Sequence, residues 1–183
     1  TASRRIKRNR PEILADLAER AEAVLDPTRL VEYCVRRSEN LAASETELAQ
    51  RAKVPPARLQ TILAALVQQQ RIRALGSGLY LHRQTECETG QRLVQALADF
   101  HARVPDSPGM TFDELRQSTA MAKAVLETVL GRLKAEGHLS EQGGRWAQAE
   151  HRTSFVGEDA QRLQAIEELY RQNAFAPPSE EEL

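Results

Sequence analysis

The side chains that most often carry catalysis or bind metal ions are sparse and scattered in this sequence. The histidines stand far apart, at His82, His101, His138 and His151. They form no His-x-x-His pair and the two cysteines form no Cys-x-x-Cys pair, although such spacings bring zinc ligands together. No glycine stands at phosphate-loop spacing before a Lys-Ser or Lys-Thr pair. The sequence therefore predicts no catalytic residue, metal site or cofactor in this chain, which we do not expect to be an enzyme.

Arginine and lysine are the other side chains able to bind a ligand, because both cations bind phosphate. One basic group lies near the N-terminus and consists of Arg4, Arg5, Lys7, Arg8 and Arg10. The other consists of Arg71, Arg73 and Arg83. We interpret both groups as candidate RNA or phosphate contacts, with a solvated linker and a solvated hairpin as the alternative.

Charge and composition limit the class of protein. Residues 1–83 hold 15 Lys and Arg against 9 Asp and Glu, whereas residues 84–183 hold 10 against 17, so a polyanion should meet the first half more readily. Only 4% of residues are aromatic, which favours a helical core of Leu, Ala, Val and Ile. We expect no membrane insertion and no secretion. Cys34 and Cys87 are expected to be buried or half-buried thiols in a reducing, cytoplasmic compartment.

The chain contains an internal repeat, found when the sequence is shifted by 67 residues against itself. The matched pairs are Leu30/Leu97, Tyr33/Phe100, Leu59/Leu126, Ile62/Val129, Leu63/Leu130, Leu66/Leu133, Ile72/Leu139 and Leu79/Trp146. Such a constant shift indicates two copies of one module. A further shift of 68 residues carries Glu114 onto Glu182, which we interpret as the start of a third copy.

In the first copy, local signals predict three helices and a hairpin. Asp26-Pro27-Thr28 predicts a helix over 28–39, and Ser44 with Glu47 has capping-box spacing for a short helix to about residue 52. A third helix is expected over 57–70, and residues 71–75 and 79–81 are expected to be strands around a glycine turn. The expected buried stripe of the third helix is Leu59, Ile62, Leu63, Leu66 and Val67.

The second copy repeats this order, with helices over 86–103, from about 111 and over 121–136, and strands at 138–141 and 145–147. Thr111 and Glu114 have cap spacing, Gly137 suits a left-handed helix end, and Trp146 should point inward. The expected inward residues of its third helix are Val125, Val129, Leu130 and Leu133. Amphipathic helices over 11–25 and 158–173 flank the two copies.

Three helices followed by a hairpin is the plan of a winged helix, so the predicted fold is a mainly α tandem of winged-helix modules with small β-hairpins (α+β). We divide the chain into a basic tail and lead-in helix at 1–27, a first winged helix at 28–83, a second at 84–150, and a connector with the start of a third at 151–183. The lead-in helix should pack on the first module or bridge from a preceding domain through Ile13, Leu14, Leu17, Ala21 and Leu25.

Four passages, in the right order, resemble the C-terminal extension of the bacterial selenocysteine-specific elongation factor. They are the Arg4–Leu14 junction, Leu79–Arg83, Phe100-His101 with Pro108-Gly109-Met110, and the passage from His151-Arg152 through Ile166–Tyr170 to Phe175–Ser179. Asp106-Ser107 departs mildly from the pattern.

The resemblance implies a parent protein whose N-terminal part binds GTP with Mg²⁺ and delivers selenocysteinyl-tRNA to the ribosome during translation. It also implies four winged helices, the last of which binds the messenger-RNA hairpin that recodes a UGA codon. This chain would hold the first two modules, with the ribosome and RNA as partners through the parent protein. The N-terminal domains and the distal winged helices would be partners in cis, and we expect a monomer.

We therefore interpret the chain as a spacer and orienting arm, with Val104–Pro108 and His151–Gly157 as candidate joints. One alternative is a DNA-binding transcription regulator, although Glu127 and Glu136 lie on the third helix and oppose phosphate. The other is a protein-interaction module.

Overall fold

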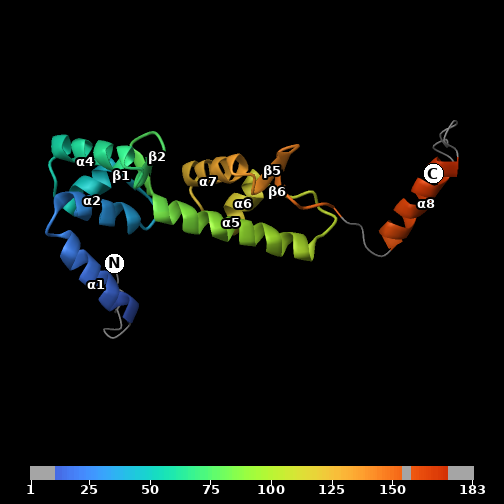
Figure 1. The fold of residues 1–183 in the computed structure, drawn as a ribbon, viewed down its shortest axis with the longest axis horizontal. Coiled ribbons are helices and arrows are strands. Elements are labelled where there is room, and N and C mark those ends of the chain that lie inside the picture. Colours follow the sequence, from blue (N-terminus) through green and yellow to red (C-terminus); the bar gives the residue numbers. More distant parts are fainter. Residues whose placement is uncertain (1–10, 154–157, 173–183) are drawn as a thin grey trace. The chain divides into compact units, whose positions relative to one another are not determined.

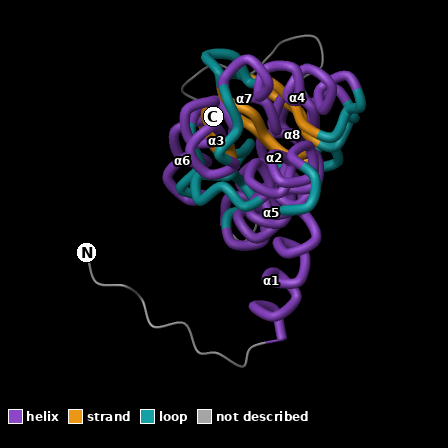
Figure 2. Tube along the Cα trace, turned by 90° about the vertical axis from the view of Figure 1, so that its left-hand side faces the viewer, coloured by secondary structure: helices purple, strands orange, loops and turns teal. Residues whose placement is uncertain are grey.

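The computed structural model describes residues 11–153 and 158–172 (Figure 1). Spatial contacts divide the chain into two compact units, the first formed by residues 1–92 and 116–132 and the second by residues 93–115 and 133–183. Short strands accompany a mainly helical chain (Figure 2), as expected for an α+β winged-helix fold. Within the described ranges, every helix is too short or too polar to cross a bilayer.

The first repeat lies entirely in the first unit and follows the expected order of helices and strands. Its elements, with the helix that precedes it, are α1 (Pro11–Ala23), α2 (Pro27–Arg36), β1 (Ala42–Ser44), α3 (Glu45–Ala52), α4 (Pro56–Gln68), β2 (Ile72–Ala74) and β3 (Leu79–His82). The carboxylate of Asp26 accepts a hydrogen bond from the Thr28 amide at 2.8 Å, and the Ser44 hydroxyl accepts one from the Glu47 amide at 3.2 Å. Both helix starts are therefore confirmed, because these oxygens satisfy amides that the helix leaves free.

The stripe of α4 forms the core of this repeat, except at one position. Leu59, Ile62, Leu63 and Leu66 are at most 7% exposed and pack with residues of α2, α3, β1 and β2. Val67, which we expected in the same stripe, is 37% exposed, so that assignment is wrong. The stripe is one residue narrower than the helical periodicity suggested.

The sheet has a third strand that the sequence did not reveal. Strand β3 lies between β1 and β2, and Ala43 of β1 pairs with Tyr80 in antiparallel register. The expected two-stranded hairpin is therefore a three-stranded sheet. Strand β1 escaped detection because it is three residues long and contains two alanines, which have little preference for strands.

Helix α1 contacts α2 through polar side chains, and among its apolar residues Ala23 is buried at 5% exposed. Its leucines Leu14 and Leu17 are 56% and 53% exposed, and Leu25, just after the helix, is 85% exposed. The Tyr33 hydroxyl of α2 instead donates to the Asp16 carboxylate at 3.1 Å. These three leucines therefore do not pack on the first module, in contrast to one of our two expectations for this helix.

The second repeat has the same order of elements, again with a short first strand. Its elements are α5 (Arg83–Arg103), β4 (Met110–Thr111), α6 (Phe112–Thr119), α7 (Lys123–Ala135), β5 (Leu139–Gln142) and β6 (Arg145–Gln148), followed by α8 (Glu158–Gln172). Strand β6 lies between β4 and β5. The division between the two units falls within α5, α6 and α7.

Local signals in this repeat are confirmed. The Thr111 amide donates to the Glu114 carboxylate at 2.6 Å, and the Glu114 amide donates back to the Thr111 hydroxyl at 3.3 Å. Gly137 ends the third helix at φ +76°. The four expected inward residues of α7 are all at most 4% exposed, and Trp146 is 9% exposed. The proposed match of Glu114 to Glu182 lies outside the described residues.

The register of the wings corrects one matched pair. Ala74 pairs with Tyr80 in the first sheet, whereas Glu141 pairs with Trp146 in the second. The second wing is therefore one residue shorter, and Trp146 corresponds to Tyr80 rather than to Leu79. A constant shift of 67 residues fails here because a turn can lose a residue without moving the core.

The cysteines require a second correction. We expected both thiols to be buried or half-buried, but Cys87 is exposed and only Cys34 is buried.

Gly109 provides a test of the second sheet. A Cβ at this position would lie 2.3 Å from the Trp146 carbonyl oxygen, and its φ of +134° disfavours any side chain. We predict that Gly109→Ala lowers the free energy of unfolding by at least about 2 kcal/mol. The control is Gly131→Ala, which meets no atom within 4 Å on α7 and should raise stability by about 0.5–1 kcal/mol. Thermal and urea unfolding measure both, and equal stabilities would contradict this account of the sheet.

Candidate nucleic-acid interface

The arginines expected to contact RNA around the first wing all lie near carboxylates. Arg71 pairs with Glu32, and Arg73 and Arg83 lie 3.1 Å and 3.9 Å from the Glu86 carboxylate. Their side chains are still 43–50% exposed, so part of each guanidinium faces solvent. The N-terminal group, Arg4, Arg5, Lys7, Arg8 and Arg10, lies outside the described residues. RNA contact by either group stays a prediction.

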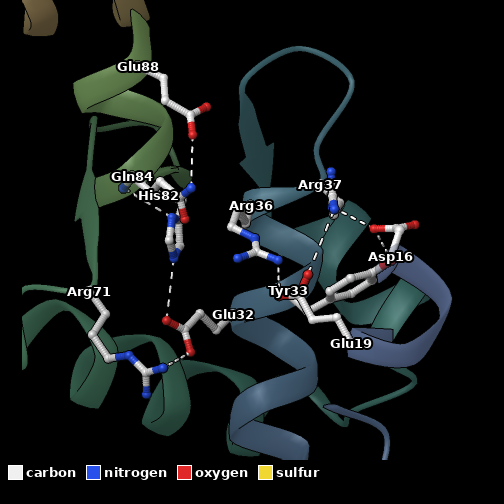
Figure 3. Close-up of polar contacts among 10 residues, drawn as sticks. All are labelled: Asp16, Glu19, Glu32, Tyr33, Arg36, Arg37, Arg71, His82, Gln84 and Glu88. Atoms are coloured by element: carbon white, nitrogen blue, oxygen red, sulfur yellow. Dashed lines mark hydrogen bonds and ion pairs between the residues drawn. The ribbon is translucent and has the colours of Figure 1, made fainter. Parts of the chain in front are cut away.

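Figure 3 shows two clusters of polar side chains beside helix α2. On one side Glu32 lies between Arg71 and His82, and on the other Arg36 pairs with Glu19 of α1. The Arg37 guanidinium lies 2.7 Å from the Asp16 carboxylate. These pairs hold α1 and the first wing against α2, so they serve structure.

His82 is a buried histidine whose tautomer the backbone defines. The Gln84 amide donates to Nδ1 at 3.1 Å, so the proton of the neutral ring is on Nε2, 3.4 Å from the Glu32 carboxylate. Burial lowers the pKa of His82, and the hydrogen bond to Glu32 partly offsets that effect. His82 therefore acts as a neutral hydrogen-bond donor between the wing and α2.

Glu86 is the most buried charge in the described part of the chain, and sequence reasoning missed it. It is 0% exposed, and the Nε atoms of Arg73 and Arg132 lie 3.1 Å and 3.3 Å from its Oε1 atom. Arg132 also donates from Nη2 to the Glu86 carbonyl at 3.3 Å. All these residues belong to the first unit. The cluster therefore fastens the start of α5 and the body of α7 to strand β2.

We predict that Glu86→Gln lowers the free energy of unfolding by about 3 kcal/mol, because it leaves neighbouring guanidinium groups without a buried counter-charge. The matched control is Glu88→Gln, which changes an exposed carboxylate on the same helix and should alter stability by less than about 0.5 kcal/mol. Urea unfolding followed by circular dichroism measures both variants. Similar stabilities for the two variants would show that the buried cluster contributes little.

In the second unit, His101 and His151 bring the two candidate joints together. Their rings stack with centroids 3.4 Å apart, and His151 Nε2 lies 3.0 Å from the Ser107 carbonyl oxygen. A carbonyl only accepts, so Nε2 carries a proton. His101 is 7% exposed, and both of its ring nitrogens are buried without a hydrogen-bond partner in the described structure.

Burial lowers the pKa of His101, and the nearby His151 lowers it further. Below the ordinary histidine pKa of about 6.5, the unfolded chain therefore binds a proton that the folded chain resists. The free energy of unfolding consequently decreases as the pH is lowered. We predict that His101→Phe reduces the loss of unfolding free energy between pH 7.5 and pH 5.5. His82 is present in both the parent chain and the variant, so its contribution cancels when their changes in unfolding free energy are compared.

The control for this titration is His138→Phe, because the His138 side chain is 63% exposed. Its dependence of stability on pH should match that of the parent chain. If His101→Phe and His138→Phe lose stability equally on acidification, burial of His101 does not govern the response.

Comparisons with known proteins find a similarity for one module of this chain. Residues 94–147 match a family model described as elongation factor SelB, winged helix. Among solved structures, the chain is similar to the mRNA-binding domain of elongation factor SelB from E. coli in complex with SECIS RNA, at 11% identity and a TM-score of 0.46. That similarity covers 67% of this chain and 97% of the other. No curated protein matches the sequence significantly. Residues 94–147, less than half of the chain, are therefore similar to a winged-helix module of elongation factor SelB.

Proposed function

We propose that this chain is a non-catalytic spacer and orienting arm of a selenocysteine-specific elongation factor. It would link the GTP-binding, tRNA-delivering domains to distal winged helices that bind the messenger-RNA hairpin. The observation that carries this proposal is the SelB family match of residues 94–147. GTP and Mg²⁺ would belong to the parent protein, which would act as a cytoplasmic monomer at the ribosome.

The packing of the first unit supports an orienting role. An arm transmits position only when its elements resist bending, and the buried Glu86 carboxylate fastens α5 and α7 to β2 within that unit. Removal of a buried ion pair partner is strongly destabilising, so such a cluster keeps the elements in one arrangement. The wing and α2 are joined by a second cluster around Glu32.

The exposed face of α7 supports this proposal over a DNA-binding regulator. Lys123 pairs with Glu127 at 3.7 Å, and Glu127 is 55% exposed, so the third helix presents a carboxylate where a DNA reader needs net positive charge. The family match points the same way. The exposed Leu14 and Leu17 of α1 are the observation that a protein-interaction module would explain.

The orienting role can be tested in the full-length factor by inserting eight Gly and Ser residues after Thr153. A flexible insert lowers the effective concentration of the two ends for each other, so selenocysteine incorporation at a UGA reporter should fall about three- to tenfold. GTP hydrolysis and hairpin affinity should not change. Unchanged incorporation would contradict an orienting role.

A salt titration of the 183-residue chain with duplex DNA distinguishes the orienting arm from a DNA-binding transcription regulator. We expect weak DNA binding that disappears by about 200 mM salt, because the chain would contact only the phosphate backbone of the duplex. Tight binding to one duplex sequence over others, surviving at that salt concentration, would establish the regulator instead.

A further inference from the structure

The outer face of the second wing forms a cleft that none of our expectations included. Its volume is ≈ 510 Å³, within the range of about 300–1,000 Å³ that is usual for ligand sites. Polar side chains from the hairpin and from the segment after it line the cleft, namely Ser140, Gln142, Arg145, His151, Arg152 and Thr153. All of them lie in the second unit.

Strand alternation builds this cleft. Gln142 pairs with Arg145 and Ser140 pairs with Ala147 across the hairpin, so these residues share one face. Leu139 and Trp146 have the opposite parity and are 3% and 9% exposed. The hairpin therefore buries Leu139 and Trp146 on one side, and its other side combines the polar residues Ser140, Gln142 and Arg145 with Ala147, which is 6% exposed.

The charge of the cleft is positive although the second half of the chain is acidic. Arg145 and Arg152 both line it, and no Asp or Glu is among the described residues of its lining. The carbonyl of Gly109 accepts a hydrogen bond from Arg145 Nη1 at 2.9 Å, which fixes the guanidinium while its other N–H groups stay available. Arg145 Nη1 also forms an ion pair at 4.0 Å with the Glu114 carboxylate, which is 52% exposed and lies outside the lining.

His151 gives the cleft a fixed wall. Its Nε2–H group donates to the Ser107 carbonyl, and its ring stacks on the buried ring of His101. Two contacts on one imidazole restrict its rotation. The segment that carries Arg152 is therefore held beside the wing by its neighbour, which lowers the entropy that a bound ligand must remove.

We propose that this cleft binds the phosphodiester backbone of an RNA strand. Guanidinium groups bind phosphate through paired N–H donors, and the hydroxyl and amide groups of Ser140, Gln142 and Thr153 add neutral hydrogen bonds. Among the described residues that line the cleft, none is Phe, Tyr or Trp, so the proposed contact is to the phosphate backbone rather than to the bases. The choice of RNA as the polyanion rests on the proposed function.

The test is fluorescence anisotropy of the full 183-residue chain with a labelled single-stranded oligouridylate between 50 and 200 mM KCl. Each lost phosphate contact reduces the slope of log K against log salt by about 0.7 on single strands. The double variant Arg145→Gln/Arg152→Gln should therefore reduce that slope by about 1.4 and weaken binding at least about tenfold at 50 mM. Circular dichroism confirms that the variant is folded.

The matched control is Arg92→Gln/Arg116→Gln, which removes the same charge from exposed positions outside the cleft. It should retain at least half of the affinity. Equal losses in the two double variants, or no binding of RNA by the parent chain, would overturn the proposal. The proposal would also be overturned if the same arginines bound polyglutamate and did not bind RNA. None of these outcomes bears on the insertion experiment, which tests the orienting role separately.

Discussion

The structure depends on the burial of one stripe of aliphatic side chains on the third helix of each repeat. Leu63 on α4 and Leu130 on α7 are each 1% exposed, and their neighbours in the stripe are similarly buried. A buried leucine contributes about 2 kcal/mol, so each stripe contributes far more than any surface ion pair. The shared spacing of these leucines explains why one plan of three helices and a three-stranded sheet appears twice. Everything polar is then arranged on a scaffold that apolar burial has defined.

Ion pairs on this scaffold determine which surfaces remain for a partner. Arginines of the first wing are shared with Glu32 and Glu86, although the first half of the chain has the larger positive charge. The outer face of the second wing has two arginines, of which Arg145 pairs with the exposed Glu114 outside the cleft, although its half of the chain is acidic. Net charge along the sequence is therefore a poor guide to local potential, because pairing in space decides which charges remain available.

Much of the fold was accessible from sequence because its signals are local. Asp26, Ser44 and the Thr111/Glu114 pair mark helix starts through contacts within three residues, and the α4 and α7 stripes follow helical periodicity. What sequence missed depends on contacts far apart in the chain. Strand β1 exists because β3 pairs with it, and Glu86 is buried because arginines from β2 and α7 surround it. The cleft likewise needs His151 to return to Ser107. The resemblance to the selenocysteine-specific factor rested on four passages in order, and the family model matches residues 94–147.

Native-state hydrogen exchange is the most direct test of the central claim that the two repeats are built on equivalent buried stripes. The account predicts that the amides of Leu63 and Leu130 exchange among the slowest in the chain, and that each responds to denaturant as a cooperative unit. Rapid exchange of either amide, at the rate of an exposed helix such as α1, would contradict it.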